Sequence, residues 1–242
     1  MAVCYPSLTL HKTHAMQYEL VIFDLAGTTV KDNKDVHRVL QSALLKHGVT
    51  ITIDDANEVM GIPKPEAIRI LLEKRHDEKD QISDRWIGEI HRVFVEDMVQ
   101  FYTFDPSVGE KEGVTKTFRA LKSLGVKVAV NTGFDRVITN ALLSRLGWQE
   151  DRLIDCSIAS DDVARGRPFP DMIFRAMSET GVQRTENVIK VGDTVSDMRE
   201  GHAAGCGIVV GITSGAFAAE ILKEEKPHHL ITQIPELLNL LK

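Results

Sequence analysis

The chain has few cysteines, and this scarcity excludes the structures that depend on them. Its three cysteines, Cys4, Cys156 and Cys206, are widely separated and form no CxxC pair. An odd number without close spacing favours neither a disulfide framework nor a zinc site. The sequence therefore predicts a protein of a reducing compartment, and we expect a cytoplasmic location.

Long apolar runs and an excess of basic residues are also lacking. No apolar run approaches the roughly 20 residues that cross a bilayer, and residues 1–15 lack the basic start and apolar block of a secretory signal. The formal net charge is -6, whereas proteins that bind nucleic acids usually carry a basic excess. We expect neither a membrane nor a nucleic-acid partner, and any bound phosphate should be held locally.

What the chain does contain is a repeated strand pattern in a composition typical of globular proteins, with 43% apolar and 26% charged residues. Short β-rich apolar runs occur at 18–23, 126–130, 156–159, 188–191 and 207–210, and helical patterns separate most of them. Alternation of this kind predicts a parallel sheet covered by helices on both faces. The expected fold class is therefore α/β, with a doubly wound, Rossmann-like parallel sheet.

The long segment after the first strand pattern has helical periodicity and no strand pattern. Val36, Leu40 and Leu44 are apolar at helical spacing, and the same pattern returns in 67–72 and 87–98. This periodicity predicts a helical domain inserted into the sheet domain. The expected segments are an N-terminal extension at 1–15, a core domain at 16–30 and 106–242, and a helical cap domain at 31–105.

Four polar residues follow the predicted strands or lie in a loop near them. They are Asp24, Thr132, Arg167 and Asp193. Taken singly, each has a plain structural explanation as a helix cap, a turn residue or a solvated loop charge. Because active groups gather at the carboxyl ends of the strands in an open parallel sheet, the four together predict a site that transfers a phosphoryl group.

Carboxylates and phosphate ligands are both present among these residues. Asp24 and Asp193, with Asp197 close by, offer the oxygen ligands that Mg²⁺ prefers. Once the metal and other donors neutralise the phosphoryl charge, the Asp24 carboxylate can attack phosphorus. An aspartyl-phosphate on Asp24 would divide one difficult displacement into two easier ones.

The remaining phosphoryl oxygens need donors. The Thr132 hydroxyl and the Arg167 guanidinium are predicted to bind them, together with Thr28 and the backbone amides around Gly27 and Gly133. The substrate should therefore lie against the carboxyl edge of the sheet.

Four segments resemble, in order and spacing, the motifs of the haloacid dehalogenase superfamily. These segments are DLAGT at 24–28, NTG at 131–133, GRP at 166–168 and GDTVSD at 192–197. The resemblance runs from about Met16 to the C-terminus. It implies Mg²⁺ as the cofactor, with the backbone carbonyl of Ala26 as a further ligand beside Asp24, Asp193 and Asp197.

Within the superfamily, the chain is most similar to phosphonoacetaldehyde hydrolase and its phosphonatase-like relatives. Ala26 stands where most phosphatases of the superfamily have a second aspartate, which serves as acid and base, and Arg167 stands where lysine is commoner. The similarity implies a small phosphorylated or phosphonate metabolite as the substrate.

This similarity also draws attention to Lys64 in the helical insert. In phosphonoacetaldehyde hydrolase, a cap-domain lysine forms a Schiff base with the substrate aldehyde, and such a lysine must be partly neutral. The alternatives for Lys64 are an exposed loop lysine between two prolines or a cation that binds phosphate. Leu25, Ala67 and Phe134 replace the Trp, His and Tyr that the family usually has, so the sequence favours a Lys64 that acts through its charge.

Three functions stay open at this point. The preferred one is Mg²⁺-dependent hydrolysis of a small phosphorylated or phosphonate metabolite through an aspartyl-phosphate on Asp24. The second is authentic phosphonoacetaldehyde hydrolysis, with a Schiff base on Lys64. The third is a ligand-binding protein without turnover, because Ala26 removes the usual acid and base. The sequence is compatible with a homodimer and does not require one.

Several other conspicuous residues are expected to be structural. Four histidines are predicted to be solvated, two in the terminal extension and two in a late surface loop: His11, His14, His228 and His229. Trp148 is interpreted as a packing residue, and Cys206 as a small core residue.

Overall fold

A single parallel sheet forms the centre of the molecule. The computed structural model describes residues 18–76 and 79–241. All neighbouring strands are parallel, in the order β3-β2-β1-β4-β5-β6. The predicted α/β fold is confirmed, and each of the five predicted strands is present with neither end displaced by more than two residues. The strands are β1 (Leu20–Phe23), β2 (Lys127–Asn131), β3 (Cys156–Ile158), β4 (Val188–Gly192), β5 (Ile208–Ile212) and β6 (His229–Ile231).

The sixth strand corrects one sequence prediction. His228 and His229 are exposed as expected, but β6 begins at His229, where a surface loop is predicted. The strand is only three residues long and follows Pro227 closely, so it carries too little alternating pattern to be recognised. His228 is not merely solvated, because its Nδ1 accepts a hydrogen bond from the Val209 amide at 2.9 Å. His11 and His14 lie outside the described residues.

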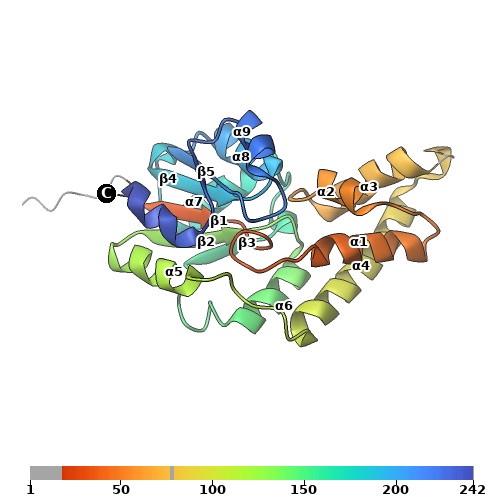
Figure 1. Cartoon of the computed structure of the whole chain (residues 1–242), viewed down its shortest axis with the longest axis horizontal. Helices are drawn as coiled ribbons and strands as arrows, with labels where there is room; N and C mark the ends of the chain where they lie inside the picture. Colours follow the sequence, from red (N-terminus) through yellow and green to blue (C-terminus); the bar gives the residue numbers. More distant parts are fainter. Residues whose placement is uncertain (1–17, 77–78, 242) are drawn as a thin grey trace, which may run out of the picture.

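Helices cover both faces of the sheet (Figure 1). From β1 to β3 the chain moves in one direction across the sheet, and from β4 to β6 it moves in the other. Right-handed crossovers then place the two sets of helices on opposite faces. Accordingly, α5 contacts β2 and η4, whereas α7 contacts α8. The helices of this domain are α5 (Val114–Ser123), α6 (Arg136–Leu146), α7 (Asp171–Thr180), α8 (Val195–Ala204), α9 (Ala219–Glu224) and the 3-10 helix η4 (Ile234–Leu241).

The central strands are buried on both faces. Every residue of β1, β4 and β5 is buried, as expected for parallel strands between two helical layers. Trp148 packs against Phe118 of α5 with ring centroids 5.2 Å apart, and Cys206 is buried. Both predictions for these residues are confirmed. Lys190, in the middle of β4, is the charged exception in this apolar core.

Four helices form a second lobe between β1 and α5, on the right in Figure 1. No strand occurs among the described residues of this segment. The longest helix, α4, contacts α1, α3 and the core helix α6. The cap helices are α1 (Asp35–Lys46), α2 (Ile53–Glu58), α3 (Lys64–Arg75) and α4 (Asp84–Phe104). In the described part of the chain, no helix has the length and apolar character needed to cross a membrane.

The cap touches the core at two glycines. A Cβ added to Gly133, just after β2, would lie 2.8 Å from the carbonyl oxygens of both Gly61 and Ile62 in the cap. Gly61 has a φ of +83°, and a Cβ there would lie 2.3 Å from the Thr194 Oγ1 of the core. The absence of side chains at these positions lets the two backbones meet.

Gly133→Ala should therefore loosen the cap without disturbing the sheet. The added methyl group should force the cap backbone to move, at a cost of about 1–3 kcal/mol. We expect faster hydrogen exchange at the amides of residues 59–62 and unchanged exchange in β1 and β4. Gly88→Ala is the matched control, because a Cβ at Gly88 in α4 would meet nothing within 4 Å. Equal exchange at 59–62 in both variants would show that the glycine contact does not hold the cap.

Candidate active site

Three carboxylates converge at the carboxyl edge of the sheet. Phe23 of β1 is paired with Val191 of β4. Asp24 follows Phe23 directly, and Asp193 follows the end of β4 at Gly192, so both carboxylates lie at the same edge of the sheet. Asp197 lies in the first turn of α8, where Thr194 caps the helix. One oxygen from each of the three aspartates lies within 4.8 Å of the others. The strand order changes direction between β1 and β4, which is where ligands bind in open α/β sheets.

The charges around these carboxylates are unevenly balanced. Burial raises the pKa of Asp24 to about 6, helped by Asp197 and opposed by Arg167. Burial, together with the charges of Asp24 and Asp197, raises the pKa of Asp193 to about 7. Burial also acts on Asp197, but Arg167 and Lys190 outweigh it and lower the pKa. Two buried carboxylates with too little positive charge beside them fit a divalent metal ion that prefers oxygen ligands.

The loop after β1 holds Asp193 in place. The Thr28 hydroxyl donates to Asp193 Oδ1 at 2.7 Å, and the Ala216 amide donates to Oδ2 at 2.6 Å. A Cβ on Gly27 would lie 2.2 Å from Oδ2, and Gly27 has a φ of +89°, so only glycine fits there. The Gly27 amide donates to the Val30 carbonyl at 2.9 Å. Thr28 and Gly27, predicted to bind phosphate, thus bond to the protein itself in this structure.

Arg167 lies at the centre of the carboxylates and not in solvent. Its NH1 is 2.7 Å from Asp24 Oδ1 and 3.1 Å from Asp197 Oδ1, and its Nε is 3.0 Å from Glu200 Oε2. Burial opposes its charge, but Asp197, Asp24 and Glu200 outweigh the burial and raise the pKa. Arg167 is therefore a permanent cation placed against the predicted nucleophile.

A second buried cation supports this arrangement, and sequence reasoning missed it. Lys190 Nζ lies 2.9 Å from Asp197 Oδ1 and 3.1 Å from Glu200 Oε2, and it donates to Asn131 Oδ1 at 2.6 Å. Asn131 Oδ1 also accepts from Arg167 at 2.6 Å. A charged residue within an apolar strand is the signal that could have identified Lys190, because a buried charge needs partners.

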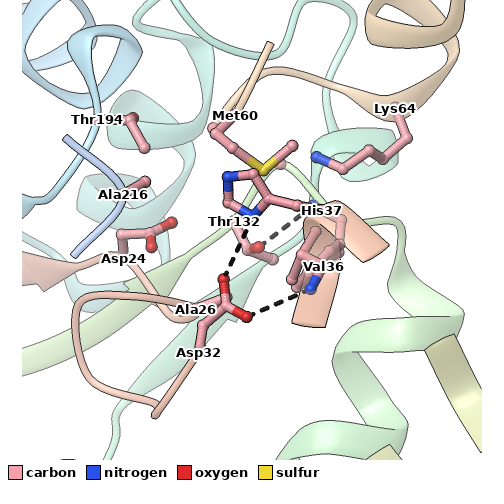
Figure 2. Close-up of a pocket in the computed structure, with 13 residues that line it drawn as sticks. Asp24, Ala26, Asp32, Val36, His37, Met60, Lys64, Thr132, Thr194 and Ala216 are labelled. Atoms are coloured by element: carbon pink, nitrogen blue, oxygen red, sulfur yellow. Dashed lines mark hydrogen bonds and ion pairs between the residues drawn. The ribbon is translucent and has the colours of Figure 1, made fainter. Parts of the chain in front are cut away.

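One small cavity joins the core residues to the cap, and Figure 2 shows its lining side chains. Thr132 and Gly133 contribute from the end of β2 and Asp24 from the end of β1. The cavity has a volume of about 30 Å³, which leaves room for only one or two water molecules. A metabolite can enter only if the cap or the lining side chains move. The residues that the cap segment contributes are Asp32, Val36, His37, Met60, Gly61 and Lys64.

Lys64 is the cation of the cap that enters this cavity. It begins α3 and is 3% exposed, so its interpretation as an exposed loop lysine is wrong. Burial lowers the pKa of Lys64 to about 8, against the opposing charge of Asp24. Its Nζ lies 5.4 Å from the ring centroid of Phe134 and 6.0 Å from that of Phe94. The apolar residues around Lys64 therefore favour a partly neutral amine.

Two further lining residues are not found by sequence reasoning. His37 and Asp32 lie at the start of α1 and both line the cavity. The available signal is the position of His37 between Val36 and Leu40 on the buried face of α1. A single histidine on the buried face of a helix is more often a packing residue than a catalytic one, so this signal is weak.

The comparisons with known proteins place the chain in a family. The sequence model of the haloacid dehalogenase-like hydrolase family matches residues 18–205. Phosphonoacetaldehyde hydrolase of Bacillus cereus strain B4264 is 34% identical over 226 residues, covering 87% of this chain and 81% of the relative. The enzyme of the same name from Bacillus anthracis is 30% identical over 240 residues, covering 93% and 88%.

A solved structure shows the same fold. The phosphonoacetaldehyde hydrolase-like protein from Oleispira antarctica superimposes with a TM-score of 0.80 at 23% identity, covering 98% of this chain and 95% of that one. The match to the family model and the identity with the curated relatives show that the chain belongs to the haloacid dehalogenase-like hydrolases.

Proposed function

We propose that this hydrolase cleaves the carbon–phosphorus bond of a small phosphonate that carries an aldehyde. The first substrate to test is phosphonoacetaldehyde, which the names of the curated relatives suggest. The sequence favours a Lys64 that acts through its charge. The surroundings of Lys64 in the structure differ from those expected for such a lysine, so we place phosphonate cleavage ahead of phosphate hydrolysis.

The observation that carries the proposal is a buried primary amine in the same cavity as the nucleophile. Lys64 and Asp24 both line the cavity, and Figure 2 has them pointing into it from the cap and from the core. An amine with a pKa of about 8 is neutral in roughly one molecule in ten at pH 7. A lysine of ordinary pKa would be neutral in fewer than about one in a thousand. Ala67 and Phe134 lack polar groups, and their apolar character favours the neutral amine.

Each group then has a distinct task. The Lys64 amine condenses with the aldehyde, and the resulting iminium can accept an electron pair from the neighbouring carbon. An Asp24 oxygen bonds to phosphorus as the carbon–phosphorus bond breaks, and the released pair forms an enamine. Hydrolysis of the enamine yields acetaldehyde, and water releases inorganic phosphate from the aspartyl-phosphate. The leaving carbon needs no acid beside Asp24, which accords with Ala26 at that position.

The metal site supports the same chemistry. Asp24, Asp193 and Asp197 would hold Mg²⁺, with the backbone carbonyl of Ala26 as a further predicted ligand. When bound, Mg²⁺ would neutralise phosphoryl charge as the carboxylate approaches. The positive charge of Arg167 would stabilise the phosphoryl oxygens, with the Thr132 hydroxyl and the Gly133 amide as predicted hydrogen-bond donors. We also propose that residues 31–105 form the cap domain. A cytoplasmic location and a homodimer are further predictions.

A second candidate is hydrolysis of a small phosphate ester or acyl phosphate, with Lys64 as a charged phosphate ligand. The two aromatic rings at 5.4 and 6.0 Å from its Nζ favour it, because aromatic faces also stabilise an ammonium group. Membership of a hydrolase family weighs against the third candidate, a binding protein without turnover.

Substitution of Lys64 separates the first two candidates. Arginine keeps the charge but cannot form a Schiff base, so Lys64→Arg and Lys64→Ala should both lose phosphate release from phosphonoacetaldehyde. Borohydride should trap an adduct on Lys64 in the native protein, roughly tenfold faster for each pH unit up to about 8 and no faster above it. Lys46→Arg, which changes an exposed lysine of the cap, is the control and should leave phosphate release unchanged. An active Lys64→Arg enzyme would contradict the Schiff base and favour the second candidate.

Asp24→Asn tests the nucleophile. The amide has nearly the same volume but cannot attack phosphorus, so phosphate release should fall by 10³-fold or more, on the order expected for loss of a covalent nucleophile. The borohydride adduct on Lys64 should still form, because the Schiff base does not need Asp24. Retention of more than a small fraction of phosphate release would exclude a covalent step at this carboxylate.

Asp193→Asn tests the metal site without an activity assay. Mg²⁺ at 100 times its dissociation constant should stabilise the native protein by about 2.7 kcal/mol, seen as a rise in its thermal midpoint. Asp193→Asn should lose most of this rise because it removes a charged ligand. Asp151→Asn, at an exposed aspartate outside the carboxylate cluster, should keep it. An equal Mg²⁺ response in both variants would place the ion elsewhere.

A further inference from the structure

One buried group in the cavity has no task in the chemistry above. His37 is 1% exposed, and its Nε2 lies 2.8 Å from Asn57 Oδ1. Because an amide oxygen only accepts hydrogen bonds, Nε2 carries the proton and Nδ1 of the neutral ring carries a lone pair. Burial lowers the pKa of His37, helped by the charges of Lys64 and Lys34 and opposed by Asn57 and Asp32. The ring is therefore neutral at pH 7 and able to accept a proton.

Nδ1 is left without a hydrogen-bond partner within the described residues. The nearest charge is Asp32, whose Oδ2 lies 3.9 Å from Nδ1. Asp32 Oδ1 accepts from the amides of Asp35 and Val36 at 2.7 and 3.3 Å, and these bonds hold the carboxylate beside the ring. An unpaired buried nitrogen is costly, and this one faces a carboxylate that would stabilise an added proton.

The unpaired nitrogen belongs to the same cavity as the amine. His37, Asp32 and Lys64 all line it, and in Figure 2 the His37 ring lies between the Lys64 side chain and Asp32. The Lys64 charge contributes to the pKa of His37, which places the two groups within electrostatic reach. Asp24 belongs to the core side of the cavity, so it is the cap that supplies the histidine, its carboxylate and the amine.

We propose that His37, backed by Asp32, carries protons between the Lys64 nitrogen and the aldehyde oxygen while the Schiff base forms. The inference rests on the proposed function, since it concerns the same lysine. It assigns a catalytic task to a residue that neither the sequence motifs nor the acidic cluster includes.

The protons balance through one carrier. His37 Nδ1 takes a proton from the Lys64 ammonium, and the free amine adds to the carbonyl carbon, whose π pair moves to oxygen. The proton on His37 passes to that oxygen, and a second proton follows from nitrogen by the same route. The oxygen leaves as water while the nitrogen lone pair forms the iminium. Two of the three ammonium protons end in water, and the third stays on nitrogen.

The test measures Schiff-base formation apart from cleavage of the phosphonate. Asp24→Asn is mixed with phosphonoacetaldehyde, quenched with borohydride at timed intervals, and the reduced adduct on Lys64 is quantified by mass spectrometry. Adding His37→Gln, which keeps an N–H donor for Asn57, should slow adduct formation by about 10²-fold or more. The adduct level reached at long times should not change, because a proton carrier alters the rate and not the equilibrium.

Two further variants guard against a purely structural effect. His91→Gln removes a histidine of α4 that faces Asp135 at 3.6 Å and does not line the cavity; it should leave the rate unchanged. His37→Phe keeps a ring in place, and adduct formation should be as slow as in His37→Gln. Either variant can therefore be used for the test if the other does not fold.

The outcomes distinguish this inference from the proposed function. No adduct in the Asp24→Asn parent would refute the Schiff base itself. An adduct in the parent that forms equally fast with His37→Gln would overturn the role of His37 alone. A loss of the final adduct level in proportion to the rate would also overturn it, because that result indicates damage to the site and not loss of a proton carrier.

Discussion

The rest of the site depends on the burial of Arg167 among carboxylates. Its guanidinium contacts Asp24, Asp197 and Glu200 at 2.7–3.1 Å, and none of these groups has more than slight exposure. Buried charges are tolerated only when they are paired, so Lys190 and Asn131 are needed to complete the network. The result is that Asp24 is held by a fixed cation on one side, while burial and the charges of Asp24 and Asp197 raise the pKa of Asp193 on the other. The imbalance marks the place where a metal ion fits.

The electrostatic environment of the cap differs from that of the core. The core assembles charges that compensate one another, whereas the cap buries a single amine beside two aromatic rings, with its Nζ donating to the Ile62 carbonyl at 3.3 Å. Phe94 and Phe134 come from opposite domains, one on α4 and the other after β2, and Lys64 Nζ lies near both rings. Side chains of both the cap and the core therefore bury Lys64, and burial is the largest cause of its lowered pKa.

The sequence predicted the core of the site better than the cap, for a physical reason. Asp24 and Asp193 follow strands that pair in register, so their meeting follows from the parallel sheet alone. The burial of Lys64 could not be predicted, because it depends on Phe94 and Phe134, which are distant in the sequence. Thr28 shows a similar limit. A threonine hydroxyl can bind phosphate, but in this structure the Thr28 hydroxyl donates to Asp193. The unpaired nitrogen of His37 depends on the positions of both Asn57 and Asp32. No periodic sequence pattern predicts such an arrangement of three residues.

Movement of the cap would order the steps of the proposed reaction. The cavity of about 30 Å³ holds one or two waters but no metabolite, so the cap or the lining side chains would first have to move to admit the substrate. Under the proposed chemistry, a substrate-filled cavity that excludes water would protect an iminium on Lys64 from hydrolysis before the carbon–phosphorus bond breaks. Release of acetaldehyde would then require water at Lys64, and attack on an aspartyl-phosphate would require water at Asp24, so both hydrolytic steps would be served by a cap that opens after cleavage. Such an opening would separate the two backbones that meet at Gly133 and Gly61, where no side chain lies between them.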